Sequence, residues 1–203
     1  MANIDCTEAL VANPERFMTS NVVMQWIQHE RPEIVRVGAK YIEGAGVANL
    51  HGARVCFFYL KPEPPCLSVY WCPYSQDSFK STMLGNDALF AMTPAVTGCS
   101  VGLGSGDGGV QMMCHVNSAR IGVDWRGTGQ EAARQASSQD AQIRYKLGQG
   151  ATIASPVAYR ATDQTTMVTF LALHGLGQPW QLWGLSYRKL GPTNYFHAGF
   201  TQY

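Results

Sequence analysis

The sequence predicts a mixed α/β fold, a single-domain sandwich of mainly antiparallel strands flanked by helices. The chain has 203 residues, of which 46% are hydrophobic, which is enough for one sizeable core and too short for two ordinary domains. Short runs of β-forming residues alternate with turn residues, and one long polar segment is typical of a surface helix. We therefore expect residues 1–203 to form one domain.

The first segment with clear character is helical. From about Cys6 to Glu30 the apolar residues fall roughly at i, i+4 spacing, which is typical of one buried helix face. Pro14 interrupts this pattern, since proline is poorly tolerated inside a helix. The apolar residues are Leu10, Val11, Phe17, Val22, Val23, Trp26 and Ile27.

Two runs rich in β-forming residues follow, Arg54–Leu60 and Cys66–Trp71. The proline-rich segment 61–65 separates them and cannot lie inside a strand, so we expect two neighbouring antiparallel strands. Asp87–Met92 reads as a short helix that ends before Pro94.

The middle of the chain predicts a hairpin. Thr97–Leu103 and Val110–Val116 are strand-like and flank a glycine-rich turn at 104–109. Arg120–Trp125 is another candidate strand.

The last third predicts one helix and three strands. Gln130–Leu147 is rich in Ala, Gln and Arg and is followed by glycines, as expected at a helix C-terminus. The remaining β-like runs are Thr152–Ala154, Met167–Leu173 and Gln181–Tyr187.

Charge and hydropathy argue against two kinds of partner. The net charge is +1, and the 15 Lys and Arg residues are scattered, so no basic face for nucleic acid is expected. No apolar stretch approaches the roughly 20 residues needed to span a bilayer. The N-terminus does not resemble a signal peptide. We expect a soluble protein made in a cytoplasm, whose export would require a route without a cleaved leader.

The cysteines and histidines indicate neither disulfides nor a metal. Six cysteines in a chain of this length do not resemble the framework of a short secreted protein, and no CxxC pair occurs. We expect no metal and no cofactor, and small buried hydrophobic roles for the cysteines other than Cys99. The other histidines, which show no paired ligand spacing, are His29, His51, His174 and His197.

Cys99 and His115 form a candidate catalytic dyad, because an imidazole beside a thiol can activate it as a nucleophile. With a five-residue loop, the hairpin would place Cys99 directly opposite His115. A register shifted by one would instead oppose Cys99 to Cys114 and turn His115 to the other face. Gly98, beside the nucleophile, would allow close approach of a substrate and let backbone N–H groups face an oxyanion.

These residues lie in a pattern that resembles a known family. Thr97-Gly98-Cys99-Ser100, followed by His115-Val116-Asn117, resembles the signature of bacterial toxin deamidases of the cytotoxic necrotizing factor type. The likeness is greatest to the Burkholderia lethal factor 1-like deamidases. It extends to Leu89-Phe90, Thr93, Gly106-Asp107-Gly108-Gly109 and the run Leu67–Pro73. The distance from the turn to His115 is longer here by a few residues.

The resemblance implies a compact sandwich like the catalytic domain of cytotoxic necrotizing factor, and hydrolysis of a glutamine side chain on a target protein. It implies Cys99 as nucleophile, His115 as base and Thr93 as the residue that orients His115, with backbone support from Gly98 and Cys99. It also implies a monomeric toxin or effector that acts in host cytosol. The expected target is a host translation-initiation helicase or a small GTPase.

Two alternatives remain open from the residues alone. The same Cys–His dyad would serve a cysteine protease or a transglutaminase-like enzyme, since the dyad defines acyl transfer and not the substrate. The chain could also be a non-catalytic binding module in which Cys99 and His115 are core residues.

Trp180 and Trp183 pack the core or line a groove for the target.

Overall fold

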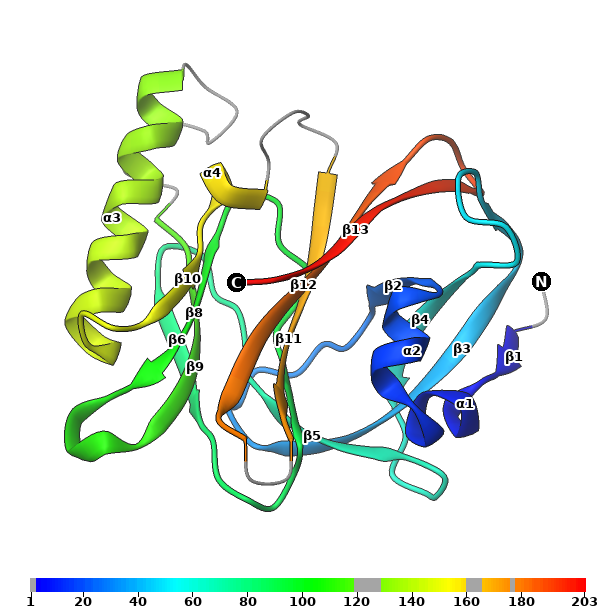
Figure 1. Ribbon diagram of the computed structural model, residues 1–203, viewed down its shortest axis with the longest axis horizontal. Coiled ribbons are helices and arrows are strands. Elements are labelled where there is room, and N and C mark those ends of the chain that lie inside the picture. Colours follow the sequence, from blue (N-terminus) through cyan, green and yellow to red (C-terminus); the bar gives the residue numbers. More distant parts are fainter. Residues whose placement is uncertain (1–2, 119–128, 160–165, 176–177) are drawn as a thin grey trace.

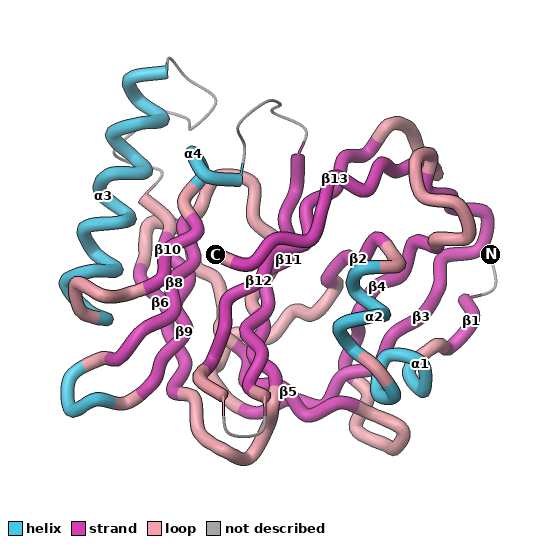
Figure 2. Tube along the Cα trace, in the orientation of Figure 1, coloured by secondary structure: helices cyan, strands magenta, loops and turns pink. Residues whose placement is uncertain are grey.

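The computed structural model describes residues 3–118, 129–159, 166–175 and 178–203. The fold is mixed α/β, with 47% of residues in strands and 20% in helices. Strands form two sheets (Figures 1 and 2), one of nine strands and one of four. None of the helices in the described ranges has the length and hydrophobicity to cross a membrane.

The large sheet has the order β13-β12-β11-β7-β5-β3-β4-β2, with β1 on β3 and a short parallel contact between β13 and β3. Most neighbours are antiparallel, while β5–β7 and β2–β4 are parallel. Its strands are β1 (Asn3–Asp5), β2 (Val22–Gln25), β3 (Ile34–Val47), β4 (Arg54–Leu60), β5 (Leu67–Trp71), β7 (Phe90–Met92), β11 (Thr166–His174), β12 (Trp180–Lys189) and β13 (Asn194–Gln202).

The small sheet is antiparallel, with the order β10-β8-β9-β6. Its strands are β6 (Phe79–Met83), β8 (Ser100–Ser105), β9 (Gln111–Val116) and β10 (Thr152–Ala154). Helix α3 (Gly129–Leu147) lies along its outer face (Figure 1). Ile143 and Leu147 of this helix pack in one cluster with Cys114 and Val116 of β9.

The inner face of the small sheet packs against the large sheet. Val101 of β8 and Met113 of β9 share a core cluster with Val168, Phe170 and Leu182 of the large sheet. Successive residues of a strand point to opposite faces. Odd-numbered residues of β8 and β9 therefore face the large sheet, and even-numbered residues face α3.

Three further helices and one turn complete the fold. Leu10 of α1 (Thr7–Ala12) and Phe17 of α2 (Pro14–Thr19) pack in a second core with Val37 and Trp71 of the large sheet. Asn13 accepts a hydrogen bond from the Arg16 N–H and so caps α2. Helix α4 (Pro156–Tyr159) and the 3₁₀ turn η1 (Asp107–Gly109) are short.

Several predicted elements are confirmed. The 97–103 and 110–116 strands correspond to β8 and β9, the 130–147 helix to α3, and the three closing strands to β10, β11 and β12. The candidate strand Arg120–Trp125 lies outside the described residues.

Three expectations are wrong. The helical pattern from Cys6 to Glu30 ends at Thr19, and Val22–Gln25 forms β2 because its apolar residues pair with β4. Asp87–Met92 is not a helix, since Phe90–Met92 pairs with both β5 and β11. The runs 54–60 and 66–71 are strands but not neighbours, because β3 lies between them and pairs with each.

Candidate active site

The β8–β9 hairpin brings Cys99 and His115 to one end of the small sheet. Its register pairs Val101 with His115 and Ser100 with Val116, so the expected direct opposition of Cys99 and His115 is wrong. The reason lies in the turn, where Gly108 and Gly109 adopt positive φ and the Gly106 N–H donates to the Val110 carbonyl. Ser105 then faces Gln111, one residue further along each strand than expected.

This register keeps both candidate residues on the same face. A shift of two residues preserves the face, whereas a shift of one would reverse it. Cys99 and His115 are thus diagonal neighbours on the face that packs against the large sheet, and Cys114 lies on the opposite face towards α3. Diagonal partners are about 7–8 Å apart at the backbone, within reach of a long side chain.

His115 is held by Thr93, which follows β7 of the large sheet. The Thr93 Oγ1 and His115 Nδ1 atoms are 2.6 Å apart, and Thr93 is fully buried. This hydrogen bond joins the two sheets. With the ring proton on Nδ1 and donated to Thr93, the lone pair of His115 lies on Nε2.

The second ring nitrogen of His115, Nε2, differs from Nδ1 in its surroundings. Nε2 is buried and has no hydrogen-bond partner among the described residues. The residue is only 2% exposed, and burial lowers the pKa of His115 to about 3. A neutral imidazole with an available Nε2 is the form that can accept a proton from a thiol.

Cys99 lies at the start of β8 with 7% of its surface exposed. The Asn117 Nδ2 donates to the Cys99 Sγ at 3.2 Å, and Asn117 itself accepts from the Asp77 N–H through Oδ1. Burial raises the pKa of the Cys99 thiol to about 11, and the Asn117 hydrogen bond opposes this rise. The resting site therefore holds a neutral thiol and a neutral imidazole rather than an ion pair.

The backbone on both sides of Cys99 is fixed by side chains from two helices. The Gly98 carbonyl accepts from Nε2 of Gln135 at 3.3 Å and of Gln139 at 3.2 Å, both on α3. The Cys99 carbonyl accepts from the Tyr159 hydroxyl of α4 at 2.6 Å. Each peptide plane that flanks Cys99 is thereby held in one orientation.

Two further side chains lie against this arrangement. The Tyr74 ring is 5.0 Å from the His115 ring between centroids and is 44% exposed, so it borders the site on the solvent side. Cys72 is fully buried, and burial raises its pKa to about 12, which makes it an inert neighbour.

Five residues that surround the dyad have no role assigned by the sequence pattern: Tyr74, Asn117, Gln135, Gln139 and Tyr159. A signal for two of them was available. Gln135 and Gln139 continue the i, i+4 row of Ile143 and Leu147 on α3, so a buried position was readable from spacing. No local pattern links Tyr159 to Cys99, because the contact depends on how α4 docks.

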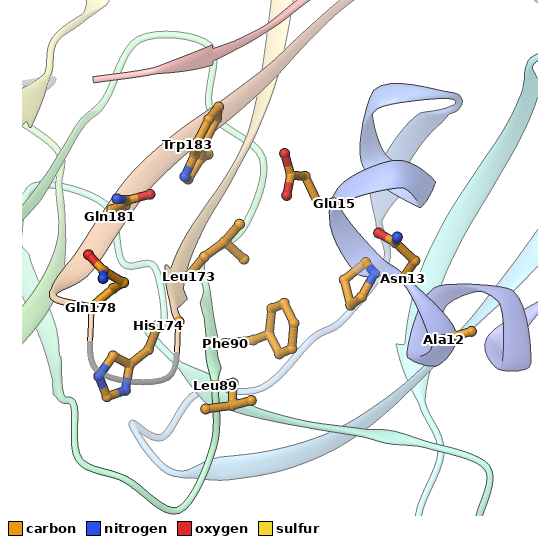
Figure 3. A pocket seen from close by; sticks show the side chains of 12 residues that line it. Ala12, Asn13, Glu15, Leu89, Phe90, Leu173, His174, Gln178, Gln181 and Trp183 are labelled. Atoms are coloured by element: carbon orange, nitrogen blue, oxygen red, sulfur yellow. The ribbon is translucent and has the colours of Figure 1, made fainter.

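A separate cavity of ≈ 370 Å³ lies between the start of α2 and strands β11 and β12, away from the dyad. Figure 3 shows Phe90 and Leu173 at its centre, with Glu15 and Trp183 on opposite sides. Trp183 lines this hollow and stacks on Phe200. Trp180 packs edge-on against Tyr70 and lines a second hollow beside β8 and the end of α3. No cluster of three His, Cys, Asp or Glu side chains suited to a metal occurs in the described ranges.

No model of a known protein family matches the chain, and no relative is found among curated proteins.

Proposed function

We propose that this chain is a cysteine-dependent protein deamidase, which hydrolyses a glutamine side-chain amide to glutamate and ammonia. The observation that carries the proposal is the arrangement of Thr93, His115 and Cys99. Thr93 bonds Nδ1 of a buried neutral imidazole, Nε2 is unpartnered, and the thiol lies on the same face of the sheet. The two-sheet architecture is compatible with the sandwich that the family resemblance implies.

The reaction begins when Cys99 Sγ attacks the carboxamide carbon of the substrate and its proton passes to His115 Nε2. The carbonyl electron pair moves to oxygen, where backbone N–H groups, including that of Cys99, stabilise the oxyanion. The oxyanion collapses, the C–N bond breaks, and His115 returns the proton so that ammonia leaves. A thioester remains on Cys99.

Hydrolysis of the thioester repeats these steps with water. His115 Nε2 takes a proton from the water as its oxygen attacks the thioester carbon. The S–C bond then breaks, the thiol is restored, and the product is a glutamate side chain. Asn117, which donates to Sγ in the resting site, stabilises the sulfur as negative charge develops there.

The protein partner in this proposal is a host protein. A translation-initiation helicase and a small GTPase are the targets that the resemblance suggests. We propose no cofactor, because the thiol, imidazole and backbone donors supply every group that the reaction needs.

Incubation of the purified protein with a eukaryotic lysate, followed by peptide mass analysis, tests the proposal. A deamidase raises the mass of a target peptide by about one mass unit without cutting the chain. New termini would indicate a protease, and incorporation of an added primary amine would indicate a transglutaminase-like enzyme. Cys99→Ser and His115→Ala should each abolish the mass change.

Thiol labelling tests whether the chain is an enzyme at all. Cys66 is partly exposed and competes for reagent, so the measurement belongs in a Cys66→Ser background. Iodoacetamide should then modify Cys99 faster than any other cysteine, and His115→Ala should slow that reaction. Uniformly slow labelling of all cysteines would support a non-catalytic binding module.

A further inference from the structure

Gln135 and Gln139 of α3 are buried amides at positions where a helix packed on a sheet normally presents apolar side chains. Gln135 is 1% exposed and Gln139 is 0% exposed. The same row of the helix continues with Ile143 and Leu147, which are apolar and buried. Burying an amide is costly unless it forms hydrogen bonds. The two glutamines therefore call for an explanation beyond packing.

Both amides are directed to one atom next to the nucleophile. Each Nε2 donates to the Gly98 carbonyl oxygen, at 3.3 Å from Gln135 and 3.2 Å from Gln139. A carbonyl oxygen has two lone pairs, so the pair of donors saturates it. We call Gln135 and Gln139 the amide clamp.

The orientation of the Gln139 amide is itself fixed. The Ser100 hydroxyl lies 2.9 Å from Gln139 Oε1 and 3.1 Å from Asp140 Oδ1, two acceptors that share its hydrogen. With Oε1 towards Ser100, the Nε2 group of Gln139 faces Gly98. The reversed amide would place its Oε1 against the Gly98 carbonyl, where two acceptors would repel each other. Ser100 on β8 thus holds the Gln139 half of the clamp in one arrangement, whereas the Oε1 atom of Gln135 has no hydrogen-bond partner among the described residues.

A fixed Gly98 carbonyl also fixes the N–H of the next residue. The Gly98–Cys99 peptide bond is trans, so its C=O and N–H point in opposite directions. The carbonyl points to α3 on the outer side of the small sheet, and the Cys99 N–H therefore points towards the inner side, where the Cys99 Sγ and His115 lie.

We infer that Gln135 and Gln139 are positioning residues that hold the Cys99 N–H ready to donate to the oxyanion formed when Cys99 attacks a carbonyl carbon. The inference rests on the proposed acyl-transfer function. Gly98 has no side chain to hold its own peptide plane, and glycine explores more backbone conformations than other residues. The clamp removes that freedom before substrate binds, which is the condition for electrostatic stabilisation of a transition state.

The clamp predicts that two reactions of the same thiol respond differently to its removal. Acylation by 4-nitrophenyl acetate passes through a tetrahedral oxyanion before 4-nitrophenolate leaves, and the acetyl group remains on Sγ. Alkylation by iodoacetamide displaces iodide at a saturated carbon and forms no oxyanion. A residue that serves only the oxyanion donor affects the first reaction and spares the second.

The experiment compares both rates at Cys99 by peptide mass analysis in wild type, Gln139→Met and Gln135→Met/Gln139→Met, all in the Cys66→Ser background. Methionine keeps the length and helix propensity of glutamine. Gln130→Met, at an exposed position of the same helix, is the matched control. Loss of one oxyanion donor typically costs about 10²–10³-fold. We expect acylation to fall about 10–100-fold, alkylation to change less than about twofold, and the control to behave as wild type.

Equal loss of both rates would overturn the inference, because the clamp would then act on the thiol or on the fold. Unchanged acylation would overturn it as well, as would a wild-type Cys99 that is alkylated but never acylated. If Gln139→Met does not fold, as judged by the lack of a cooperative unfolding transition, Gln135→Met provides the same comparison. This variant leaves one donor on the Gly98 carbonyl. No glutamine substrate is involved, so acylation that depends on the clamp without any deamidated lysate peptide would refute the deamidase and retain the clamp.

Discussion

At the scale of single residues, the orientation of His115, the proposed base, is set by one hydroxyl. Thr93 and His115 come from different sheets, and their 2.6 Å contact is the polar link between them at the dyad. An imidazole held through Nδ1 presents Nε2 in a defined direction. In the proposed reaction, the thiol of Cys99 is neutral before attack, so its proton must pass to Nε2 as the sulfur attacks the substrate. The orientation of the His115 ring would then govern the rate.

Replacement of Thr93 by valine keeps the shape of the side chain and removes the hydroxyl. General acid–base catalysis accelerates reactions about 10²–10⁴-fold. We expect Thr93→Val to lower the rate of Cys99 acylation by 4-nitrophenyl acetate at least about tenfold. Thr93→Ser, which restores a hydroxyl, should recover most of the rate. Full activity in Thr93→Val would show that another group orients His115.

The three residues of the proposed site could be proposed from the sequence, but not the contacts that surround them. Cys99, His115 and Thr93 belong to a local pattern that a family resemblance makes readable. Gln135, Gln139 and Tyr159 are distant in sequence, and their contacts with the Gly98 and Cys99 carbonyls depend on how α3 and α4 dock on the small sheet. Spacing shows which residues of α3 face the sheet, but not which atoms they contact there.

At the scale of elements, the strands that failed prediction are those whose identity comes from pairing. Phe90–Met92 has too few residues to show the alternating hydrophobicity of a strand. It is a strand because β5 and β11 pair with it on either side. β3 was not predicted, although it pairs with β4 and β5 and separates them. The hairpin was found, but its register was wrong, since positive φ at Gly108 and Gly109 decides which residues face each other.

The close packing of α3 on β8 depends on a glycine of the strand. A Cβ at Gly104 would lie 2.9 Å from the Leu147 carbonyl oxygen, a backbone atom that cannot rotate away. We expect Gly104→Ala to lower the free energy of unfolding by about 1–3 kcal/mol, as overpacking does, and to slow Cys99 acylation because α3 carries the amide clamp. Thermal unfolding and the acylation assay measure the two effects.

Gly150→Ala is the control for this substitution. No heavy atom lies within 4 Å of a Cβ built at Gly150, so the alanine should be neutral or slightly stabilising. If Gly104→Ala unfolds at the same temperature as wild type, the helix does not sit on β8 as closely as the structure places it.

At the scale of the whole molecule, the candidate base is part of the core that joins the two sheets, and this couples chemistry to stability. Burial lowers the pKa of His115 from 6.5 to about 3, so between these values the unfolded chain binds a proton that the folded chain does not. Stability rises with pH wherever the unfolded state binds more protons. The contribution of His115 is therefore intact above pH 6.5 and is lost progressively as the pH falls towards 3.

This linkage can be isolated by replacing the imidazole with a group that does not titrate. Asparagine retains a polar atom near the position of Nδ1, and we expect His115→Asn to unfold with a shallower dependence on pH than wild type. Each proton bound only by the unfolded chain changes the free energy of unfolding by about 1.4 kcal/mol per pH unit. Denaturant unfolding at several pH values between about 6.5 and 4 measures the two slopes.

Other groups also change their protonation on unfolding, so the contribution of His115 is the difference between the pH slopes of wild type and His115→Asn. Burial lowers the pKa of His197, which adds to the dependence of stability on pH in the same window. The pKa of the Asp5 carboxyl is lowered chiefly by its hydrogen bond to Lys61, against the opposing effect of burial, so Asp5 contributes only at lower pH. Both remain in wild type and variant and cancel in the comparison. His51→Asn, at an exposed position, is the matched control substitution. Parallel slopes for wild type and His115→Asn would mean that His115 is not buried as a neutral ring between the sheets, and the dyad would lose its base.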